Sequence, residues 1–260
     1  MTQPATVNPT LPPRVSRMIE AFEGGWLAGD FDGMILSWGP FQWNLGQGTL
    51  QPLLARLVTL APMLVQQRLG PEIVSAIKAG RIIQFARTNI LTPAGHARVE
   101  WQRKFARLAQ EPVTQQVFSD AMRPYLDRGQ RLASTLGLET ERAYALCCDV
   151  SVQNGAVRTD HVNAFRRRLA DGVYAPGVPL LNPSDPPEWE RLKTLAHTVA
   201  DLANPRWREN VLARKLTIAL GRGTVHGRHY VMHEDFGIRY WDPTTSGALA
   251  LWRAEPPNPA

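Results

Sequence analysis

The stretch MIEAFEGGWLAGDFDGMILSWGPFQWNLGQGTL, residues 18–50, joins an acidic helix end to a loop rich in glycine, tryptophan and amide side chains. Apolar residues around its start recur at the spacing of one helix face: Val15, Met18, Ile19 and Phe22. A Gly-Gly pair ends this helix directly after Glu23. Because a helix C-terminus carries the negative end of the helix dipole, an acid there holds its proton more tightly. Glu23 is therefore a candidate general acid.

The segment after this helix, residues 26–48, has glycine at positions 29, 33, 39, 46 and 48. Its β-type residues, Met34, Ile35 and Leu36, lie between these glycines, which predicts a loop and a short hairpin. Thr49 then caps a predicted helix over 49–69, and the leucine-rich face of that helix indicates a core element.

The remainder of the chain is predicted to be mostly α. Three helices begin with an N-cap residue followed by proline, at Thr92-Pro93, Asp185-Pro186 and Asn204-Pro205. The predicted helices cover 92–109, 113–136 with a kink at Pro124, 139–154, 159–170, 185–202 and 204–220. Residues 1–13 and 253–260 are expected to be flexible tails around a single domain over 14–252. The proline-rich segment 171–187 is the candidate connection between two lobes of that domain.

The composition is that of a folded globular protein. With 260 residues and 44% hydrophobic side chains, the chain can bury a substantial core. Its two cysteines, Cys147 and Cys148, are adjacent on a predicted helix, where their side chains point in different directions. We therefore expect two reduced core thiols and no disulfide.

The charge of the chain favours anionic partners. A formal charge of +6 and a pI of about 9.7 attract polyanions, of which nucleic acid and the bacterial cell wall are the candidates. Arginines are dense only at 166–168, and no nucleic-acid motif accompanies them, so glycan binding is preferred. The N-terminus lacks the pattern of a secretory signal, and no apolar run is long enough to cross a bilayer. We expect synthesis in the cytoplasm, and delivery to the periplasm or cell wall by a secretion system or phage lysis.

The motif around Glu23 resembles the lysozyme superfamily, above all its goose-type and transglycosylase branches. Glu23 is followed by Ser37, Gly39 and Gln42 in S-W-G-P-F-Q, with Asn44 just beyond. The spacing is one residue shorter between Ser and Gly than in that superfamily. The segments CCDVSVQNG, residues 147–155, and GRGTVHG, residues 221–227, are similar to chitosanase-like proteins of bacteria and phages. The resemblance implies a two-lobed helical fold with a small β-hairpin and loop region beside a glycan cleft, lined by Ser37, Gln42 and Asn44.

The second carboxylate of such a site is less clearly marked. Chitosanases carry an aspartate in the loop after the acid, and Gln47 occupies the corresponding region, near residues 46–48. Asp32, in D-F-D-G-M, is the best candidate to reach a water molecule across the cleft. The alternative is that Asp30 and Asp32 satisfy backbone N–H groups of a local turn. A calcium loop is rejected because the remaining ligands are missing.

Asp149 lies within an apolar helix and requires a buried cationic partner. The helix that carries Arg206, Arg208 and Arg214 supplies candidates, and we select Arg214. In chitosanase-like relatives a buried Asp–Arg pair positions the catalytic acid, which the resemblance implies for this pair; a purely structural ion pair is the alternative. Asn154, at the end of the same helix, is expected either to contact acetamido or hydroxyl groups or to cap the helix.

The segment GRGTVHGRHYVMHED, residues 221–235, is predicted to be a loop and short hairpin that closes the cleft, with Thr224, His226 and Tyr230 facing the substrate. The alternative is a structural turn. Zinc is not expected, because its three histidines secure no helical i, i+4 pair. A phosphate-binding loop is rejected because G-R-G-T lacks the Lys-Ser/Thr ending.

Together these observations predict a glycoside hydrolase that cleaves β-1,4 bonds of an amino-sugar polymer without a cofactor or a metal. Peptidoglycan is the preferred substrate, which would make the protein a muramidase or a lytic transglycosylase that degrades cell walls. The alternatives are a chitosanase and a non-catalytic glycan-binding or phage-structural module. An immunity or delivery partner would be compatible with this role.

Overall fold

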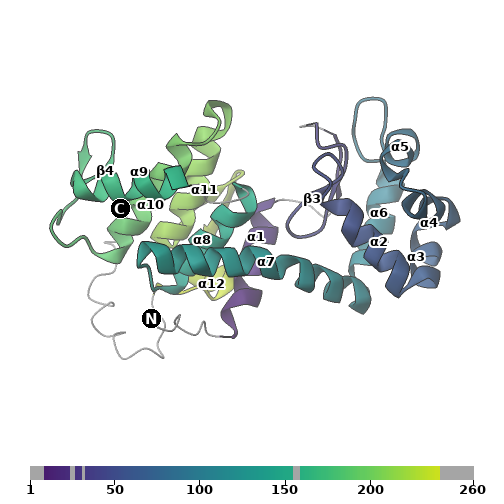
Figure 1. The fold of residues 1–260 in the computed structure, drawn as a ribbon, viewed down its shortest axis with the longest axis horizontal. Helices are drawn as coiled ribbons and strands as arrows, with labels where there is room; N and C mark the ends of the chain where they lie inside the picture. Colours follow the sequence, from purple (N-terminus) through teal and green to yellow (C-terminus); the bar gives the residue numbers. More distant parts are fainter. Residues whose placement is uncertain (1–8, 24–26, 31–32, 155–158, 241–260) are drawn as a thin grey trace. The chain divides into compact units, whose positions relative to one another are not determined.

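The computed structural model describes residues 9–23, 27–30, 33–154 and 159–240. In this part of the chain most residues are helical, and the strands form three small antiparallel sheets (Figure 1). The mostly α fold class is therefore confirmed. The chain divides into two compact units: unit 1 comprises Met1–Met18 and Tyr125–Ala260, and unit 2 comprises Ile19–Pro124.

Unit 2 contains a small sheet followed by short helices. Its elements are the end of α1 (Leu11–Glu23), β1 (Leu27–Ala28), β2 (Ser37–Trp38), β3 (Trp43–Asn44), α2 (Leu50–Leu60), α3 (Pro62–Leu69), α4 (Pro71–Lys78), α5 (Ile82–Phe85), the π-helix η1 (Ala86–Ile90), α6 (Val99–Ala109) and the first part of α7 (Pro112–Leu136). The fully buried Trp38 packs edge-on against Phe105 of α6 and Phe118 of α7, with centroids 5.0 and 4.9 Å away. Trp43 stacks on Phe118 at 5.4 Å. These tryptophans therefore fix the sheet to the helices as core residues.

Two helix boundaries of unit 2 differ from the sequence prediction. The helix expected over 49–69 is interrupted at Ala61, whose φ is −143°, and α3 restarts with Pro62. Proline disfavours the helical conformation of the residue before it, which explains the break. The helix expected from Thr92 begins at Val99 instead. Thr92 closes a turn in which its hydroxyl accepts a hydrogen bond from the His96 N–H at 3.2 Å, so it does not cap a helix.

Unit 1 is built around α8 (Glu141–Gln153), in which every residue from Glu141 to Ser151 is buried. The other elements are the second part of α7, α9 (Thr159–Ala170), β4 (Val173–Ala175), β5 (Val178–Pro179), α10 (Glu188–Asp201), the 3-10 turn η2 (Pro205–Trp207), α11 (Arg208–Leu220), β6 (Arg222–Val225), β7 (Arg228–Val231) and α12 (Met232–Phe236). Residues 171–187 contain the β4–β5 hairpin and lie within this unit. The short helix α12 was not predicted.

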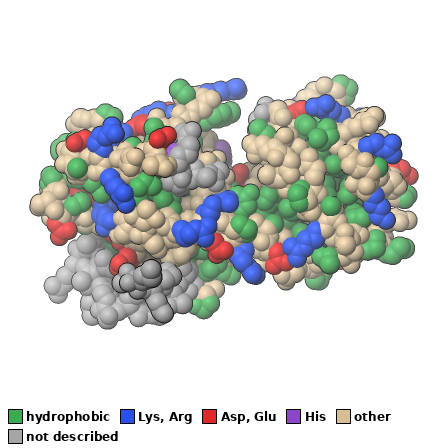
Figure 2. Space-filling view, viewed as in Figure 1, with side chains coloured by type: hydrophobic (Ala, Val, Ile, Leu, Met, Phe, Trp, Pro, Cys, Tyr) green, Lys and Arg blue, Asp and Glu red, His purple; other side chains and the backbone are tan. Residues whose placement is uncertain are grey.

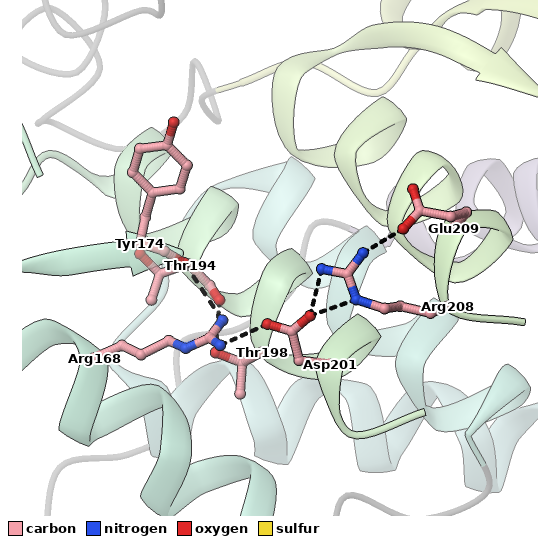
Figure 3. A network of polar contacts seen from close by, with 7 residues as sticks. All are labelled: Arg168, Tyr174, Thr194, Thr198, Asp201, Arg208 and Glu209. Carbon is pink, nitrogen blue, oxygen red and sulfur yellow. Dashed lines mark hydrogen bonds and ion pairs between the residues drawn. The ribbon is translucent and has the colours of Figure 1, made fainter. Parts of the chain in front are cut away.

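A charged network joins four elements of unit 1 (Figure 3). Asp201 ends α10 and accepts hydrogen bonds from Arg168 of α9 at 2.6 Å and from Nε of Arg208 of α11 at 2.8 Å. Arg168 also donates to the backbone carbonyl of Tyr174 in β4, at 3.4 Å. Partial burial would raise the pKa of Asp201, but the two guanidinium groups outweigh it and hold the pKa below its usual value.

The two cysteines of α8 are free and fully buried. Burial raises the pKa of both the Cys147 and the Cys148 thiol, because the thiolate form would lose its hydration. The expectation of reduced core thiols is therefore confirmed. Among the helices that the structure describes, none is long and apolar enough to cross a membrane.

Candidate active site

Glu23 is the last residue of α1 and is partly buried, next to the fully buried Phe22. The end of the helix therefore coincides with the candidate acid, as the sequence predicts. Asp32, proposed as the second carboxylate, lies outside the described residues, so its role stays a prediction.

The loop between β1 and β2 contains a strained three-residue turn. The N–H of Leu36 donates to the carbonyl of Met34 at 2.8 Å, and Ile35 between them has a φ of +70°. A β-branched residue rarely adopts a positive φ, because its side chain clashes with the backbone. The carboxylate of Asp30 holds the turn by accepting the Ile35 N–H at 2.9 Å. Strained backbone of this kind is concentrated at functional sites, and here it immediately precedes Ser37.

A second contact fixes the start of this loop. The N–H of Asp30 donates to the carbonyl of Gly95 at 2.7 Å, and a side chain at Gly29 would overlap that carbonyl. Glycine is therefore required where the two backbones approach. Beside this contact lies a hollow of about 260 Å³, lined by residues 27–30, 94–97 and Gln102. Asp30 is therefore held by two hydrogen bonds, one from its backbone N–H to Gly95 and one to its carboxylate from Ile35.

The three candidate substrate-binding residues of unit 2 lie on or between β2 and β3. Ser37 pairs with Asn44 across the sheet, and both are buried. Asn44 organises the following turn, since its Oδ1 accepts from the N–H of Gln47 at 2.8 Å and its Nδ2 donates to Oε1 of Gln47 at 3.3 Å. Gln42 has a φ of +48°, and both its backbone N–H and its Nε2 donate to the carbonyl of Gly39 at 3.0 Å. These bonds shape the turns, and contact with a substrate stays a prediction.

In unit 1, Asp149 forms the ion pair with Arg214 that the sequence suggested. Nε and Nη2 of Arg214 lie 2.9 and 2.5 Å from Oδ1 of Asp149, and Nζ of Lys215 lies 2.5 Å from Oδ2. The exposed fractions are 0% for Asp149, 2% for Arg214 and 0% for Lys215. Burial would raise the pKa of Asp149, but the two cations outweigh it and hold the pKa below its usual value. Lys215, which also donates to Oε1 of Gln153 at 2.7 Å, was missed.

The other two arginines that were considered for Asp149 have different contacts. Arg208 binds Asp201, and the guanidinium of Arg206 lies over the ring of Trp207. Asn154 follows α8 as its C-cap, and its backbone N–H donates to the carbonyl of Val150. Its side-chain Oδ1 is buried and accepts no hydrogen bond from the described residues. Its proposed contact with substrate is untested.

The predicted hairpin of residues 221–235 is present as β6 and β7, which pair Thr224 with His229 and Gly223 with Tyr230. Because side chains alternate across a strand, Thr224 and His229 point to the exposed side, while Tyr230 is buried and stacks on Phe236 at 5.7 Å. His226 forms the turn at the tip with a φ of +50° and is exposed. Roles for Thr224, His226 and Tyr230 in substrate binding remain predictions.

Comparisons with known proteins identify the fold. No protein-family model matches the sequence, and no curated protein matches it. Among solved structures, the chain is similar to the GH46 chitosanase of Gynuella sunshinyii in complex with chitotetraose, with 15% identity and a TM-score of 0.56 over 87% of this chain and 98% of that chain. The chain has a lysozyme-like fold. Over the matched 87% of this chain, the fold is that of a glycoside hydrolase.

Proposed function

We propose that this protein is a glycoside hydrolase that cleaves β-1,4 bonds of an amino-sugar polymer, with Glu23 as the general acid. The observation that carries this proposal is the chitosanase-like fold over 87% of the chain. In this chain α1 ends at a partly buried glutamate, and a small antiparallel sheet follows. Cleavage of a glycosidic bond requires a carboxylic acid that donates a proton to the leaving oxygen. A partly buried acid at a helix end is suited to that task.

We propose roles for the other candidate residues on the same basis. Asp32 would orient the attacking water or stabilise the positive charge that develops on the sugar. Should no second carboxylate act, the substrate's own groups would complete the reaction, as in a lytic transglycosylase. The Asp149–Arg214 pair would position Glu23. This role rests on the resemblance, because a purely structural ion pair explains the burial of the paired charges equally well.

Two polymers are candidate substrates, each favoured by one observation. The chitosanase with the same fold was solved with chitotetraose, which favours chitosan. The net charge of +6 favours peptidoglycan, whose carboxylates attract a cationic protein, whereas chitosan is itself cationic. Figure 2 shows Lys and Arg side chains spread over the visible surface among acidic, apolar and other residues. For a wall substrate we also propose delivery by a secretion system or phage lysis.

The test is a comparison of wild type with Glu23→Gln on chitosan oligomers and on purified cell-wall sacculi, with products analysed by mass spectrometry. We expect Glu23→Gln to lower product formation about 10²- to 10⁴-fold, the contribution of a positioned general acid. Glu20→Gln, one turn earlier on α1 and also partly buried, is the matched control and should retain activity. Reducing ends in the products indicate hydrolysis, and anhydro-sugar ends indicate transglycosylation. Products formed equally well by Glu23→Gln would overturn the proposal and favour a non-catalytic glycan-binding module.

A further inference from the structure

An exposed tryptophan lies at the start of α11, remote in sequence from the candidate acid. Trp207 is 48% exposed, an unusual setting for so large an apolar side chain. The guanidinium of Arg206 lies over its ring, 4.8 Å from the ring centre, which places a cation against one face of the indole. Exposed aromatic residues next to arginine are typical of binding surfaces.

The tip of the β6–β7 hairpin lies against the same end of α11. Asn210 follows Trp207 by three residues, which places both side chains on one side of the helix. Nδ2 of Asn210 lies 3.2 Å from Nδ1 of His226, the exposed residue at the tip. Arg228 is the first residue of β7 after this turn; it is exposed and pairs with Val225 of β6. We call Arg206, Trp207, Asn210, His226 and Arg228 the tip surface.

The tip surface and the hairpin beside it are cationic. Residues 221–231 contain two arginines and two histidines but no acid. Arg222 shares the outward side of the hairpin with Thr224 and His229, and all three are exposed. The acids nearest in sequence to Arg206 and Arg228 are Asp201, Glu209 and Glu234. Asp201 and Glu209 pair with Arg208, and Glu234 lies 4.0 Å from His233. Within the described part of the chain, none of these three acids forms an ion pair with Arg206 or Arg228.

This combination specifies the chemistry of a ligand. The indole offers a flat apolar face for a sugar ring, and Asn210 and His226 offer groups that can bond to hydroxyl or acetamido groups. The planar guanidinium groups match the geometry of carboxylates. A polymer that carries amines would instead be repelled. We propose that the tip surface binds a carboxylate-bearing segment of an amino-sugar polymer, and thereby selects anionic wall glycan over cationic chitosan.

This inference rests on the proposed function for the choice of polymer, but its test measures binding alone. The parent protein carries Glu23→Gln, a substitution introduced to prevent cleavage of the ligands. It is titrated by calorimetry with two tetrasaccharides. One contains N-acetylmuramic acid and carries carboxylates; the other is neutral N-acetylchitotetraose. Adding Trp207→Ala should weaken binding of both about tenfold, the effect expected for an aromatic contact residue. Adding Arg206→Gln should weaken only the carboxylated ligand, about threefold to tenfold, and should reduce the salt dependence of its binding.

Matched controls are Leu181→Ala, which removes another exposed apolar side chain of unit 1, and Arg131→Gln, which removes an exposed arginine of α7. Both should bind like the parent protein, and thermal melting should show that all variants are folded. Unchanged binding of both tetrasaccharides by Trp207→Ala, or an equal loss of affinity for both in Arg206→Gln, would overturn the inference. A failure of this inference is distinguishable from a failure of the proposed function, because these outcomes are differences in binding between variants of one parent protein, whereas the role of Glu23 is tested by product formation.

Discussion

Substitution of Asp149 by asparagine should strongly destabilise unit 1. Asparagine keeps the shape of the side chain but removes its charge, so the buried Arg214 and Lys215 both lose the carboxylate that they bind. Breaking a fully buried ion pair by removing one partner costs about 3–5 kcal/mol. That is a large part of the roughly 5–15 kcal/mol that holds a typical protein folded. We therefore expect a clear fall in the urea concentration at which the protein unfolds, with no change in the slope of the transition.

Two further variants separate the charge effect from a loss of packing. The triple substitution Asp149→Leu, Arg214→Met and Lys215→Met removes all three charges, and should recover most of the lost stability because the two cations that lose the Asp149 carboxylate are removed with it. Glu209→Gln, which alters an exposed acid beside Arg208, should change stability by less than about 0.5 kcal/mol. A loss below about 1 kcal/mol in Asp149→Asn would refute the reasoning, since that is the scale of a surface ion pair.

The same cluster fixes how stability changes at low pH. Because the pKa of Asp149 is lower in the folded protein than its usual value of about 3.9, the folded state binds this proton less readily than the unfolded state. The stabilisation is therefore complete above about pH 4 and is lost as the pH falls through the folded pKa. Asp201, whose pKa is also lowered, contributes with the same sign. Wild type should lose stability on acidification, and the triple variant should lose less.

Two further predictions concern the thiols and the strained turn. Burial raises the pKa of Cys147 and Cys148, so both should be unreactive toward a thiol reagent at neutral pH until urea unfolds the chain; rapid labelling of the native protein would contradict this. Asp30→Ala removes the acceptor of the Ile35 N–H and should cost about 1–2 kcal/mol and speed hydrogen exchange at Ile35, whereas Asp30→Asn keeps an oxygen acceptor and should cost less. Equal effects of the two variants in denaturation and exchange measurements would show that the bond does not hold the turn.

Local signals predicted most helices of this fold, and failed where a side chain had a competing partner. Asn204 behaves as predicted: its Oδ1 accepts the N–H of Arg206 and starts a turn that leads into α11. Thr92 is likewise a cap-type residue followed by proline, but its hydroxyl accepts the N–H of His96 within a turn. Threonine and asparagine cap helices and turns by the same hydrogen bond, so sequence alone does not decide between them.

Part of the candidate site was predictable because a buried charge requires a partner. A carboxylate within an apolar helix must have a cationic partner, and this requirement led to Asp149 and Arg214. The apolar pattern around Asp149 requires only one cationic partner. Because Arg214 meets that requirement, the sequence does not indicate Lys215 as a second partner. The positive φ of Ile35 was also beyond prediction, since a branched residue is the least expected one there. A residue keeps an unfavourable backbone conformation of this kind only when tertiary contacts hold it, and those contacts are not visible in the local sequence.

The hairpin shows which part of a site is determined by register. Its tip, His226-Gly227, has two positive φ values, and a two-residue turn of this kind fixes which residues face each other. Once Thr224 is opposite His229, Val225 and Tyr230 must both point to the other side, where they are buried. The alternation R-G-T-V is compatible with either orientation until the turn is placed. Placing the turn at His226-Gly227 is therefore the step that puts Thr224 on the exposed side of the hairpin and Tyr230 on the buried side.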